Sequence, residues 1–360
     1  MSNVRVGVIG TSWYADIAHL PRVKSHPRAE LAAICGRNRA RAEEMADKYG
    51  IPLVYTDYRE MIEVGDLDAV IVSTPDDLHY PMTMAALDAG LHVLCEKPMA
   101  LDRTQAKEMY EKAEAAGVKH MVCFTYRWAP AYRYLKQLLE EGYIGRCYHC
   151  RFGYLAGYGR AGRYGWKYDR RRGLGALGDL GSHMIDLARW YVGDIVRVSA
   201  CLDAFVERPG HEGEALDPAN DAAFLTVEFE NGAQGMIEIS AVAHVGARGQ
   251  EQQVRLYGSL GTLEADGSIL EGEMRGVRHD EEQLRVLPVP DALWGDVNRA
   301  QPLAMQIMEA FVKQPIGDRL FIDAILGDQP VVPSFYDGLK VQEVIDAALR
   351  SHQRGEWVST

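Results

Sequence analysis

The chain has 360 residues, of which 47% are apolar and 25% charged, and its formal net charge is −12. This composition excludes fibrous and disordered classes, and the length favours two domains. The negative charge argues against a nucleic-acid partner, and no apolar run approaches the roughly 20 residues that span a bilayer.

The cysteines and the start of the chain favour a reducing compartment. The sequence begins MSNVRVGVIG and enters a strand almost directly, so we expect no signal peptide. Six cysteines are scattered along the chain. Cys147 and Cys150 form a C-x-x-C, but no second pair completes a zinc site, and we interpret both as structural. We therefore expect a cytoplasmic protein.

Short apolar runs alternate with helical patterns over residues 1–125. Buried strands are expected at 4–10, 30–35, 69–75, 91–98 and 120–124. Helices are expected at 39–50, 80–90 and 104–117, each ending in a glycine that suits a helix C-cap. Strict alternation of this kind predicts an α/β fold with a doubly wound parallel sheet.

The pattern changes after residue 145 to longer segments in which apolar and polar residues alternate. Within 222–242, Asn231 and Gly232 form a strong two-residue hairpin signal. Further helices are expected at 176–193, 300–325 and 336–354. We predict an α+β domain over residues 126–360 with a large, open, mostly antiparallel sheet covered by helices on one face; the last helix could pack back on the first domain.

The turn after the first strand resembles a phosphate-binding fingerprint. Gly10, Ser12 and Ala15 occupy the three positions of G-x-G-x-x-G/A, which need a tight turn, a close backbone approach to pyrophosphate and a small residue. Ser12 departs from the pattern. The place of this turn, in the first strand-turn-helix of an alternating domain, favours dinucleotide binding over an ordinary turn.

The end of the second strand bears on cofactor choice. An NAD enzyme usually has an acidic residue there, whereas this chain has Gly36 and Arg37, with Arg41 one helical turn later. An arginine at this point can bind a 2′-phosphate with two hydrogen bonds. The alternative is a solvated arginine at a helix start.

Two loops are expected at the same edge of the parallel sheet. Residues 73–81 (STPDDLHYP) and 94–101 (LCEKPMAL) each follow a strand, and carboxyl ends of parallel strands line the ligand crevice. His79 is either a packing histidine or a ligand contact. Lys97, followed by Pro98, is either part of a solvated turn or a lysine at the nicotinamide end of the crevice.

Asp179, His183 and Asp186 share one face of the helix expected at 176–193. They could bind a metal, but no fourth ligand is near in the sequence. They could also be core residues satisfied by the backbone. We favour a general acid/base histidine oriented or tuned by Asp179.

These blocks together resemble the glucose-fructose oxidoreductase / inositol dehydrogenase / MocA (Gfo/Idh/MocA) family over nearly the whole chain. The matching blocks, in the family's order, are GTSWYADIAHLP, VSTPDDLHYP, CEKPMAL, RWAPAYRYLKQLLEEGYIG, GLGALGDLGSHMIDLARWYVG and SFYDGLKVQEVIDAALRS. The resemblance implies a Rossmann domain that binds NAD or NADP, and hydride transfer to or from a sugar, polyol or sugar derivative. It implies that Lys97, Asp179 and His183 are catalytic, with His183 moving the hydroxyl proton.

We expect the following site residues. The cofactor is expected to contact Gly10, Thr11, Ser12, Trp13, Tyr14, Gly36, Arg37, Asn38, Arg41, Ser73, Thr74, Pro75, His79, Glu96, Lys97 and Arg127. The substrate is expected to contact Lys97, Tyr126, Trp166, Asp179 and His183, and no metal is expected. Gly36 and Arg37 favour NADP over NAD.

The resemblance also allows two alternative functions. Related folds include regulators that bind the dinucleotide without turnover, against which Lys97, Asp179 and His183 argue. Other relatives are NAD-dependent glycoside hydrolases that use a transient oxidation. Net cofactor turnover would distinguish a dehydrogenase from such a hydrolase. We also expect a homodimer or homotetramer formed through the C-terminal sheet, whose strands carry apolar residues on both faces.

Overall fold

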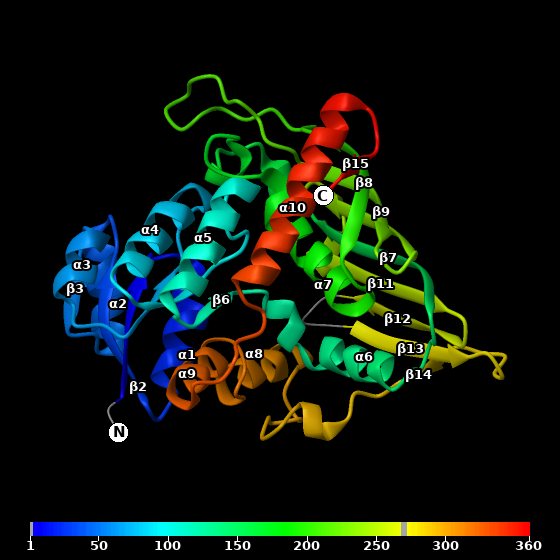
Figure 1. Ribbon diagram of the computed structural model, residues 1–360, viewed down its shortest axis with the longest axis horizontal. Helices are drawn as coiled ribbons and strands as arrows, with labels where there is room; N and C mark the ends of the chain where they lie inside the picture. Colours follow the sequence, from blue (N-terminus) through cyan, green and yellow to red (C-terminus); the bar gives the residue numbers. More distant parts are fainter. Residues whose placement is uncertain (1–2, 268–271) are drawn as a thin grey trace. The chain divides into compact units, whose positions relative to one another are not determined.

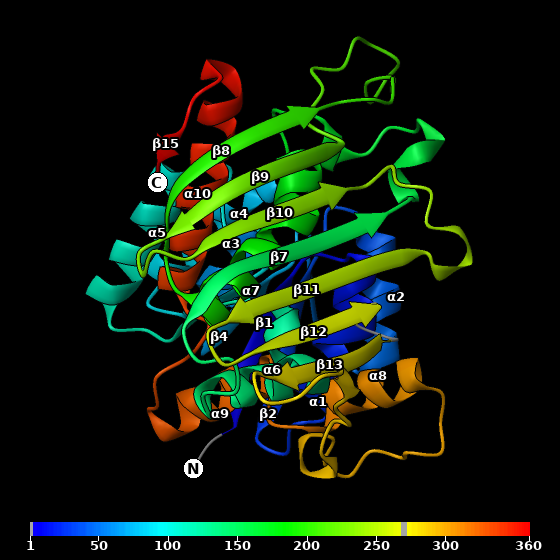
Figure 2. The same cartoon turned by 90° about the vertical axis from the view of Figure 1, so that its right-hand side faces the viewer.

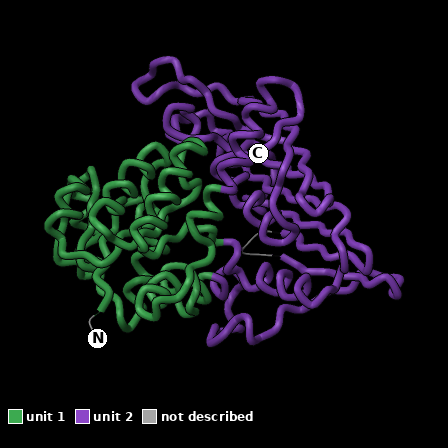
Figure 3. The backbone as a smooth tube through the Cα atoms, viewed as in Figure 1, with its two compact units in different colours: residues 1–125, 308–339 green, residues 126–307, 340–360 purple. Residues whose placement is uncertain are grey.

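The computed structural model describes residues 3–267 and 272–360, which form two compact units (Figure 3). The first unit comprises residues 1–125 and 308–339, and the second comprises residues 126–307 and 340–360. The first division between the units falls between Thr125 and Tyr126. Residues 308–339, which the pattern assigns to the second domain, lie in the first unit because Phe321 and Ile322 bury their side chains where the helix Asp318–Gly327 packs on the parallel sheet.

The first unit contains a six-stranded parallel sheet in the order β3-β2-β1-β4-β5-β6. Its strands belong to the part of the chain that is coloured from blue to cyan in Figure 1. Its strands are β1 (Val4–Ile9), β2 (Ala29–Cys35), β3 (Leu53–Tyr55), β4 (Ala69–Val72), β5 (His92–Cys95) and β6 (His120–Val122). This confirms the doubly wound sheet. The strand order reverses beside β1, and ligands of such sheets bind at that switch point.

Helices connect these strands, and two further helices of the first unit come much later in the chain. They are a π-helical turn η1 (Ala15–His19), α1 (Leu20–Lys24), α2 (Arg39–Tyr49), α3 (Tyr58–Val64), α4 (Asp76–Asp88), α5 (Arg103–Ala116) and α9 (Asp318–Gly327), with α8 (Leu303–Lys313) entering from the second unit. Gly50 and Gly117 end α2 and α5 in the left-handed region, at φ 72° and 65°. The predicted glycine C-caps at these two helix ends are confirmed.

The second unit contains a nine-stranded sheet in the order β14-β13-β12-β11-β7-β10-β9-β8-β15 (Figure 2). Its strands are β7 (Cys147–Ala156), β8 (Ile195–Asp203), β9 (Ala222–Phe229), β10 (Gln234–Ser240), β11 (Gln250–Gly258), β12 (Gly261–Gly267), β13 (Gly272–Arg278), β14 (Arg285–Val286) and β15 (Val358–Ser359). The hairpin predicted at Asn231 and Gly232 joins β9 to β10, with Gly232 at φ 82°. Apart from the parallel pair β7 and β10, the described strands of this sheet pair antiparallel.

Helices cover one face of this sheet. They include α6 (Pro130–Glu140), a π-helical turn η5 (Leu177–Gly181) that leads into α7 (Ser182–Val192), and α10 (Phe335–Arg354), whose residues 335–339 belong to the first unit. Short 3₁₀ turns occur at η2 (Thr125–Trp128), η3 (Tyr158–Ala161), η4 (Trp166–Tyr168), η6 (Gly246–Arg248) and η7 (Asp291–Leu293). Phe152 on β7 stacks against Tyr191 on α7, and this face of the sheet is buried.

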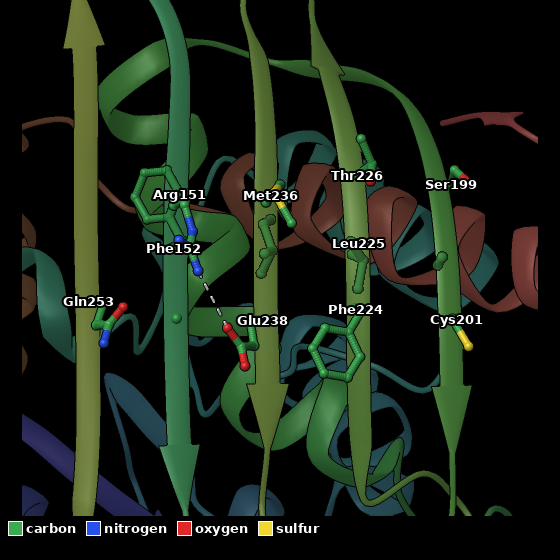
Figure 4. Close-up of a pocket in the computed structure, with 13 residues that line it drawn as sticks. Arg151, Phe152, Ser199, Cys201, Phe224, Leu225, Thr226, Met236, Glu238 and Gln253 are labelled. Atoms are coloured by element: carbon green, nitrogen blue, oxygen red, sulfur yellow. Dashed lines mark ion pairs between the residues drawn. The ribbon is translucent and has the colours of Figure 1, made fainter.

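The opposite face of the sheet is open (Figure 4). Phe224 and Met236 are 51% and 53% exposed there, and Arg151 pairs with Glu238 at 3.8 Å. These side chains border a shallow hollow of about 310 Å³. The face is therefore mixed, because apolar side chains lie among charged pairs that also include Arg197 with Glu228 and Arg255 with Glu264.

Among the helices of residues 3–267 and 272–360, none combines the length and the apolar composition that a membrane crossing requires.

Candidate active site

The register of the parallel sheet brings the expected cofactor loops to one edge. Cys35, Ile9, Val72 and Cys95 are consecutive partners across β2, β1, β4 and β5. The next residues along each strand, which are Gly36, Gly10, Ser73 and Glu96, therefore follow at the same carboxyl edge. The structure thus brings four of the expected cofactor positions together within the first unit.

The turn after β1 can only be built with glycine at position 10. Gly10 has φ +121°, and a Cβ there would lie 2.0 Å from the Ser73 carbonyl oxygen. The Ser12 hydroxyl accepts the Ala15 N–H at 3.0 Å and lies 3.0 Å from the Ser73 hydroxyl. Ser12 therefore caps the following turn, which gives the serine at the second fingerprint position a physical role. Ala15 is fully buried, as the third position requires.

Gly36 begins the segment expected to bind the ribose. A Cβ on Gly36 would lie 2.5 Å from Thr11 Cγ2, so the two turns are in close contact. Asn38 caps α2 by accepting the Arg41 N–H at 3.1 Å. Arg41 is engaged within the protein, because its guanidinium pairs with Asp16 and with Glu44, each at 2.7 Å.

Arg37 differs from Arg41. Its side chain is exposed, and no ion pair or hydrogen bond joins it to another described residue. Arg37 is therefore the cation at this turn that can reach a ligand phosphate without first losing a protein partner.

His79 joins the two loops expected at the crevice. Its Nδ1 lies 2.8 Å from the Pro98 carbonyl oxygen and its Nε2 lies 2.9 Å from the Thr74 carbonyl oxygen. Burial lowers the pKa of His79, despite these two acceptors. The side chain is 1% exposed, so the structure places it between the loops, where it fixes the segments that carry Pro75 and Lys97.

Of the remaining cofactor candidates at this edge, Trp13 and Tyr14 lie differently. Trp13 is 72% exposed, whereas the Tyr14 hydroxyl lies 3.0 Å from the Thr125 hydroxyl. Burial raises the pKa of Tyr14, so its phenol stays neutral. A large exposed ring beside the glycine turn is available to a ligand, while Tyr14 is committed to the protein.

Lys97 follows Glu96, the first residue after β5. Its backbone N–H donates to Glu96 Oε2 at 3.2 Å, and the Lys97–Pro98 peptide is cis. The other oxygen of Glu96, Oε1, lies 3.1 Å from His19 Nε2. Lys97 thus lies at the strand end that the sequence predicts, on a backbone held by its neighbour's carboxylate.

His19, Glu96 and Cys123 place an imidazole nitrogen, a carboxylate oxygen and a thiol within 4.8 Å of one another. These groups are ordinary metal ligands. Hydrogen bonds already account for His19, however, because its Nδ1 lies 2.6 Å from Asp318 Oδ1 and its Nε2 faces Glu96. We interpret the group as a hydrogen-bonded ion-pair cluster.

In the second unit, Asp179 lies just before α7 and His183 lies in its first turn. Asp179 Oδ2 accepts hydrogen bonds from the Tyr158 hydroxyl at 2.5 Å and from Lys167 Nζ at 2.6 Å. The His183 ring stacks on Tyr126, with 4.1 Å between centroids and 13° between planes. Asp179 belongs to the π-helical turn η5, a kind of turn frequent at functional sites.

Tyr126 contacts His183 through its ring, while its hydroxyl bonds elsewhere. That hydroxyl donates to the Tyr154 hydroxyl at 2.7 Å, and Tyr154 donates to Gln250 Oε1 at 2.7 Å. Burial raises the pKa of Tyr126 well above its ordinary value, so it is a neutral donor. The imidazole of His183 therefore rests on a ring fixed by a chain of hydrogen bonds.

Asp186 and Arg127 form a buried ion pair, which the sequence did not predict. Arg127 donates to both oxygens of Asp186, at 2.8 and 2.6 Å, and the two side chains are 5% and 1% exposed. Because the Arg127 guanidinium binds both oxygens of Asp186, this carboxylate is not available as a third metal ligand beside Asp179 and His183. The cofactor contact expected of Arg127 likewise competes with a buried two-point ion pair.

Sequence reasoning missed Tyr158 and Lys167. Both lie in short 3₁₀ turns, and the Lys167 ammonium lies 5.2 Å from the centre of the Tyr158 ring and 5.8 Å from that of Trp166. An aromatic and basic segment was the available signal. No spacing in the sequence relates either residue to Asp179.

Comparison with known proteins decides the family. Residues 4–124 match the model of an oxidoreductase family with an NAD-binding Rossmann fold, and residues 136–360 match that family's C-terminal alpha/beta domain. The chain belongs to the Gfo/Idh/MocA oxidoreductase family. The predicted family is thus confirmed, and with it the enzyme class, an NAD(P)-dependent dehydrogenase or reductase.

Relatives of this chain include proteins named as sugar dehydrogenases. Levoglucosan dehydrogenase of Pseudarthrobacter phenanthrenivorans is 29% identical, over 99% of this chain and 98% of the relative. D-glucoside 3-dehydrogenase of Escherichia coli is 30% identical, over 79% of this chain and 86% of the relative. The solved structure of levoglucosan dehydrogenase with NADH and L-sorbose has a TM-score of 0.89 and 29% identity, over 99% of this chain and 98% of that one.

Proposed function

We propose that this enzyme transfers a hydride between a nicotinamide cofactor and a hydroxyl-bearing carbon of a sugar, a polyol or a sugar derivative. The observation that carries the proposal is the arrangement at α7, where His183 rests on Tyr126 and Asp179 is held by Tyr158 and Lys167. Relatives named as levoglucosan and D-glucoside dehydrogenases support the same substrate class.

The first unit fits a dinucleotide. A Cβ would lie 2.0 Å from the Ser73 carbonyl oxygen at Gly10 and 2.5 Å from Thr11 Cγ2 at Gly36. Because neither glycine has a side chain, the backbone of both turns is open to a close approach by the dinucleotide. The residues that would hold the dinucleotide are Gly10, Ser12 and Thr74 near the pyrophosphate and Arg37 near the ribose. When bound, the nicotinamide accepts or gives the hydride.

The protein's own groups manage the proton and the charge. In the oxidative direction His183 takes the hydroxyl proton, because a hydride leaves carbon easily only when the oxygen carries negative charge. The Lys97 ammonium stabilises the developing alkoxide through a charge-assisted hydrogen bond. Asp179 fixes Lys167 and Tyr158, two further donors suited to sugar hydroxyls.

A substrate panel tests this proposal. Polyols, aldoses, glycosides and keto-sugars are incubated with NAD⁺, NADP⁺ or their reduced forms, and the absorbance of the reduced nicotinamide is followed. Net reduction or oxidation with at least one sugar or polyol is expected. Release of aglycone without net cofactor change would instead identify a hydrolase, and tight dinucleotide binding without any turnover would identify a regulator.

For the cofactor we propose a preference for NADP over NAD, carried by Arg37. Replacing Arg37 by alanine should weaken NADPH binding about ten-fold or more while sparing NADH, since a charged hydrogen bond contributes about 1.5–3 kcal/mol. Fluorescence titration with both reduced dinucleotides measures this. Arg39→Ala is the matched control, because Arg39 lies nearby in α2 but pairs with Glu43 at 2.9 Å. Tighter binding of NADH than NADPH by the unaltered protein would refute the preference.

For the assembly we propose a homodimer or homotetramer in which the open sheet face meets a second copy. A face that combines exposed Phe224 and Met236 with a charged pair is typical of a covered surface (Figure 4). Phe224→Arg should reduce the sedimenting species to the 40.1 kDa monomer. Val64→Arg, on a 58% exposed residue of α3, should leave the assembly intact. A monomer of unaltered protein at micromolar concentration would contradict the proposal.

We propose that the enzyme works in the cytoplasm. All six cysteines lie within the described part of the chain and are free thiols, which supports a reducing compartment.

A further inference from the structure

A buried group of charges lies beneath the loop that carries Lys97. His19 ends the π-helical turn η1, Glu96 follows β5, and Asp318 begins α9, far away in the sequence. The side chains of His19 and Asp318 are fully buried and that of Glu96 is 12% exposed. Charges removed from water in this way must be compensated by one another.

His19 joins the two carboxylates. Its Nδ1 lies 2.6 Å from Asp318 Oδ1, and its Nε2 lies 3.1 Å from Glu96 Oε1. A carboxylate accepts hydrogen bonds and does not donate them, so both ring nitrogens must carry protons for both contacts to form. Carboxylate oxygens at both ring nitrogens therefore favour the imidazolium form of His19.

The surroundings of His19 balance its charge. Arg22 on α1 donates to Asp318 Oδ2 at 3.2 Å, so the two carboxylates face two cations. Tyr14 meets the His19 ring edge-on at 5.2 Å, and Cys123, after β6, lies beside Glu96. Burial raises the pKa of both the Tyr14 phenol and the Cys123 thiol, so each stays neutral. Lys97 is the remaining cation near Glu96.

Burial alone would lower the pKa of His19. Asp318 and Glu96 outweigh that effect, and the pKa of His19 is raised to about 9. The same pairings hold the pKa of Asp318 and of Glu96 below their ordinary values, against the effect of burial. His19 is thus charged at neutral pH and loses its proton only as the pH rises through about 9.

Glu96 links His19 to the backbone of Lys97. While Oε1 faces His19, Oε2 accepts the backbone N–H of Lys97 at 3.2 Å. A neutral His19 keeps a single N–H and cannot donate to both carboxylates. Because Asp318 is the shorter contact and also holds Arg22, Glu96 is the partner that is released.

We propose that His19 is a positioning residue whose imidazolium, fixed by Asp318, holds Glu96 and thereby sets the backbone of Lys97 at the end of β5. This inference rests on the proposed function, in which Lys97 is catalytic. It predicts that the alkaline side of the rate profile belongs to His19 and not to Lys97 alone.

The test compares Asp318→Asn with the unaltered enzyme, using the substrate that the panel identifies. Removing the Asp318 charge should move the alkaline fall of kcat to lower pH by at least one unit while dinucleotide binding is retained. Asp323→Asn is the matched control: Asp323 also lies on α9 and pairs with a histidine, His26, at 3.0 Å, but away from Glu96. Its profile should match that of the unaltered enzyme.

A second readout needs no turnover. In protein labelled with ¹⁵N, the ring signals assigned by their loss in His19→Gln should titrate near pH 9, and the Lys97 amide should shift with the same midpoint. Both midpoints should fall in Asp318→Asn. This separates the two proposals: an active Lys97→Met enzyme would refute the catalytic role of Lys97 whatever the titration shows.

Three results would overturn the inference. A titration midpoint of His19 near pH 6.5 would show that the His19 ring is neutral when the enzyme turns over. A lowered His19 midpoint in Asp318→Asn with an unmoved kcat profile would disconnect His19 from catalysis. Stoichiometric zinc in the purified enzyme, lost to a chelator together with the His19 signals, would mean that His19, Glu96 and Cys123 bind a metal instead.

Discussion

Replacing His183 by asparagine should lower turnover by roughly 10² to 10⁴, the range typical of a general acid/base group, without loss of dinucleotide binding. Asparagine keeps a polar side chain of similar size but cannot take a proton near neutral pH. Steady-state rates give the loss, and fluorescence titration gives the binding. His149→Asn is the control, because His149 also stacks on a tyrosine, Tyr257, at 4.6 Å, but lies on β7. Near-normal turnover in His183→Asn would return His183 to a packing role.

Lys97→Met extends this prediction. If Lys97 and His183 act at the same chemical step, the double variant should lose far less than the product of the two single losses. Losses that multiply would instead show that the two residues act independently.

Asp186→Ala should destabilise the protein by about 3–5 kcal/mol, because it leaves the Arg127 guanidinium buried without its carboxylate. The pair is 5% and 1% exposed and joined by two hydrogen bonds. The midpoint of urea unfolding measures the effect. Asp217→Ala removes an exposed pair, with Arg170 at 3.6 Å, and should cost less than about 1 kcal/mol.

An apolar double replacement, Arg127→Met with Asp186→Leu, should recover most of the lost stability, since it removes both charges together. If Asp186→Ala costs no more than Asp217→Ala, the ion pair between Arg127 and Asp186 does not stabilise this part of the second unit. The same outcome would reopen a ligand role for Arg127.

Local sequence signals predicted most of the fold. Parallel strands buried on both faces read as apolar runs, and glycine at Gly50 and Gly117 fixed where helices end. Asn231 and Gly232 identified the hairpin between β9 and β10 because few other dipeptides suit its backbone. The short strand β3, whose residues are exposed or half-buried, lacks such a run and was not among those expected.

Partners that are distant in the chain could not be predicted. Asp318 meets His19 across 299 positions, and Asp186 meets Arg127 across 59. Helical spacing placed Asp186 beside Asp179 and His183, but spacing along one helix says nothing about which other element supplies a partner. The residues of the candidate site were predictable as types at strand and helix ends, whereas their pairing depends on tertiary packing.

The first unit is formed by two separate segments of the chain, so a single continuous fragment that contains only this unit does not exist. A gene fragment ending at residue 125 would encode all six parallel strands but not Asp318, nor the Phe335 N–H that donates to His120 Nδ1 at 3.1 Å. Such a fragment would leave His19 and Arg22 without the Asp318 carboxylate, so that only Glu96 would balance their charges. Anyone who transplants the nucleotide-binding half onto another scaffold must therefore carry residues 308–339 with it, as a second graft joined to the first.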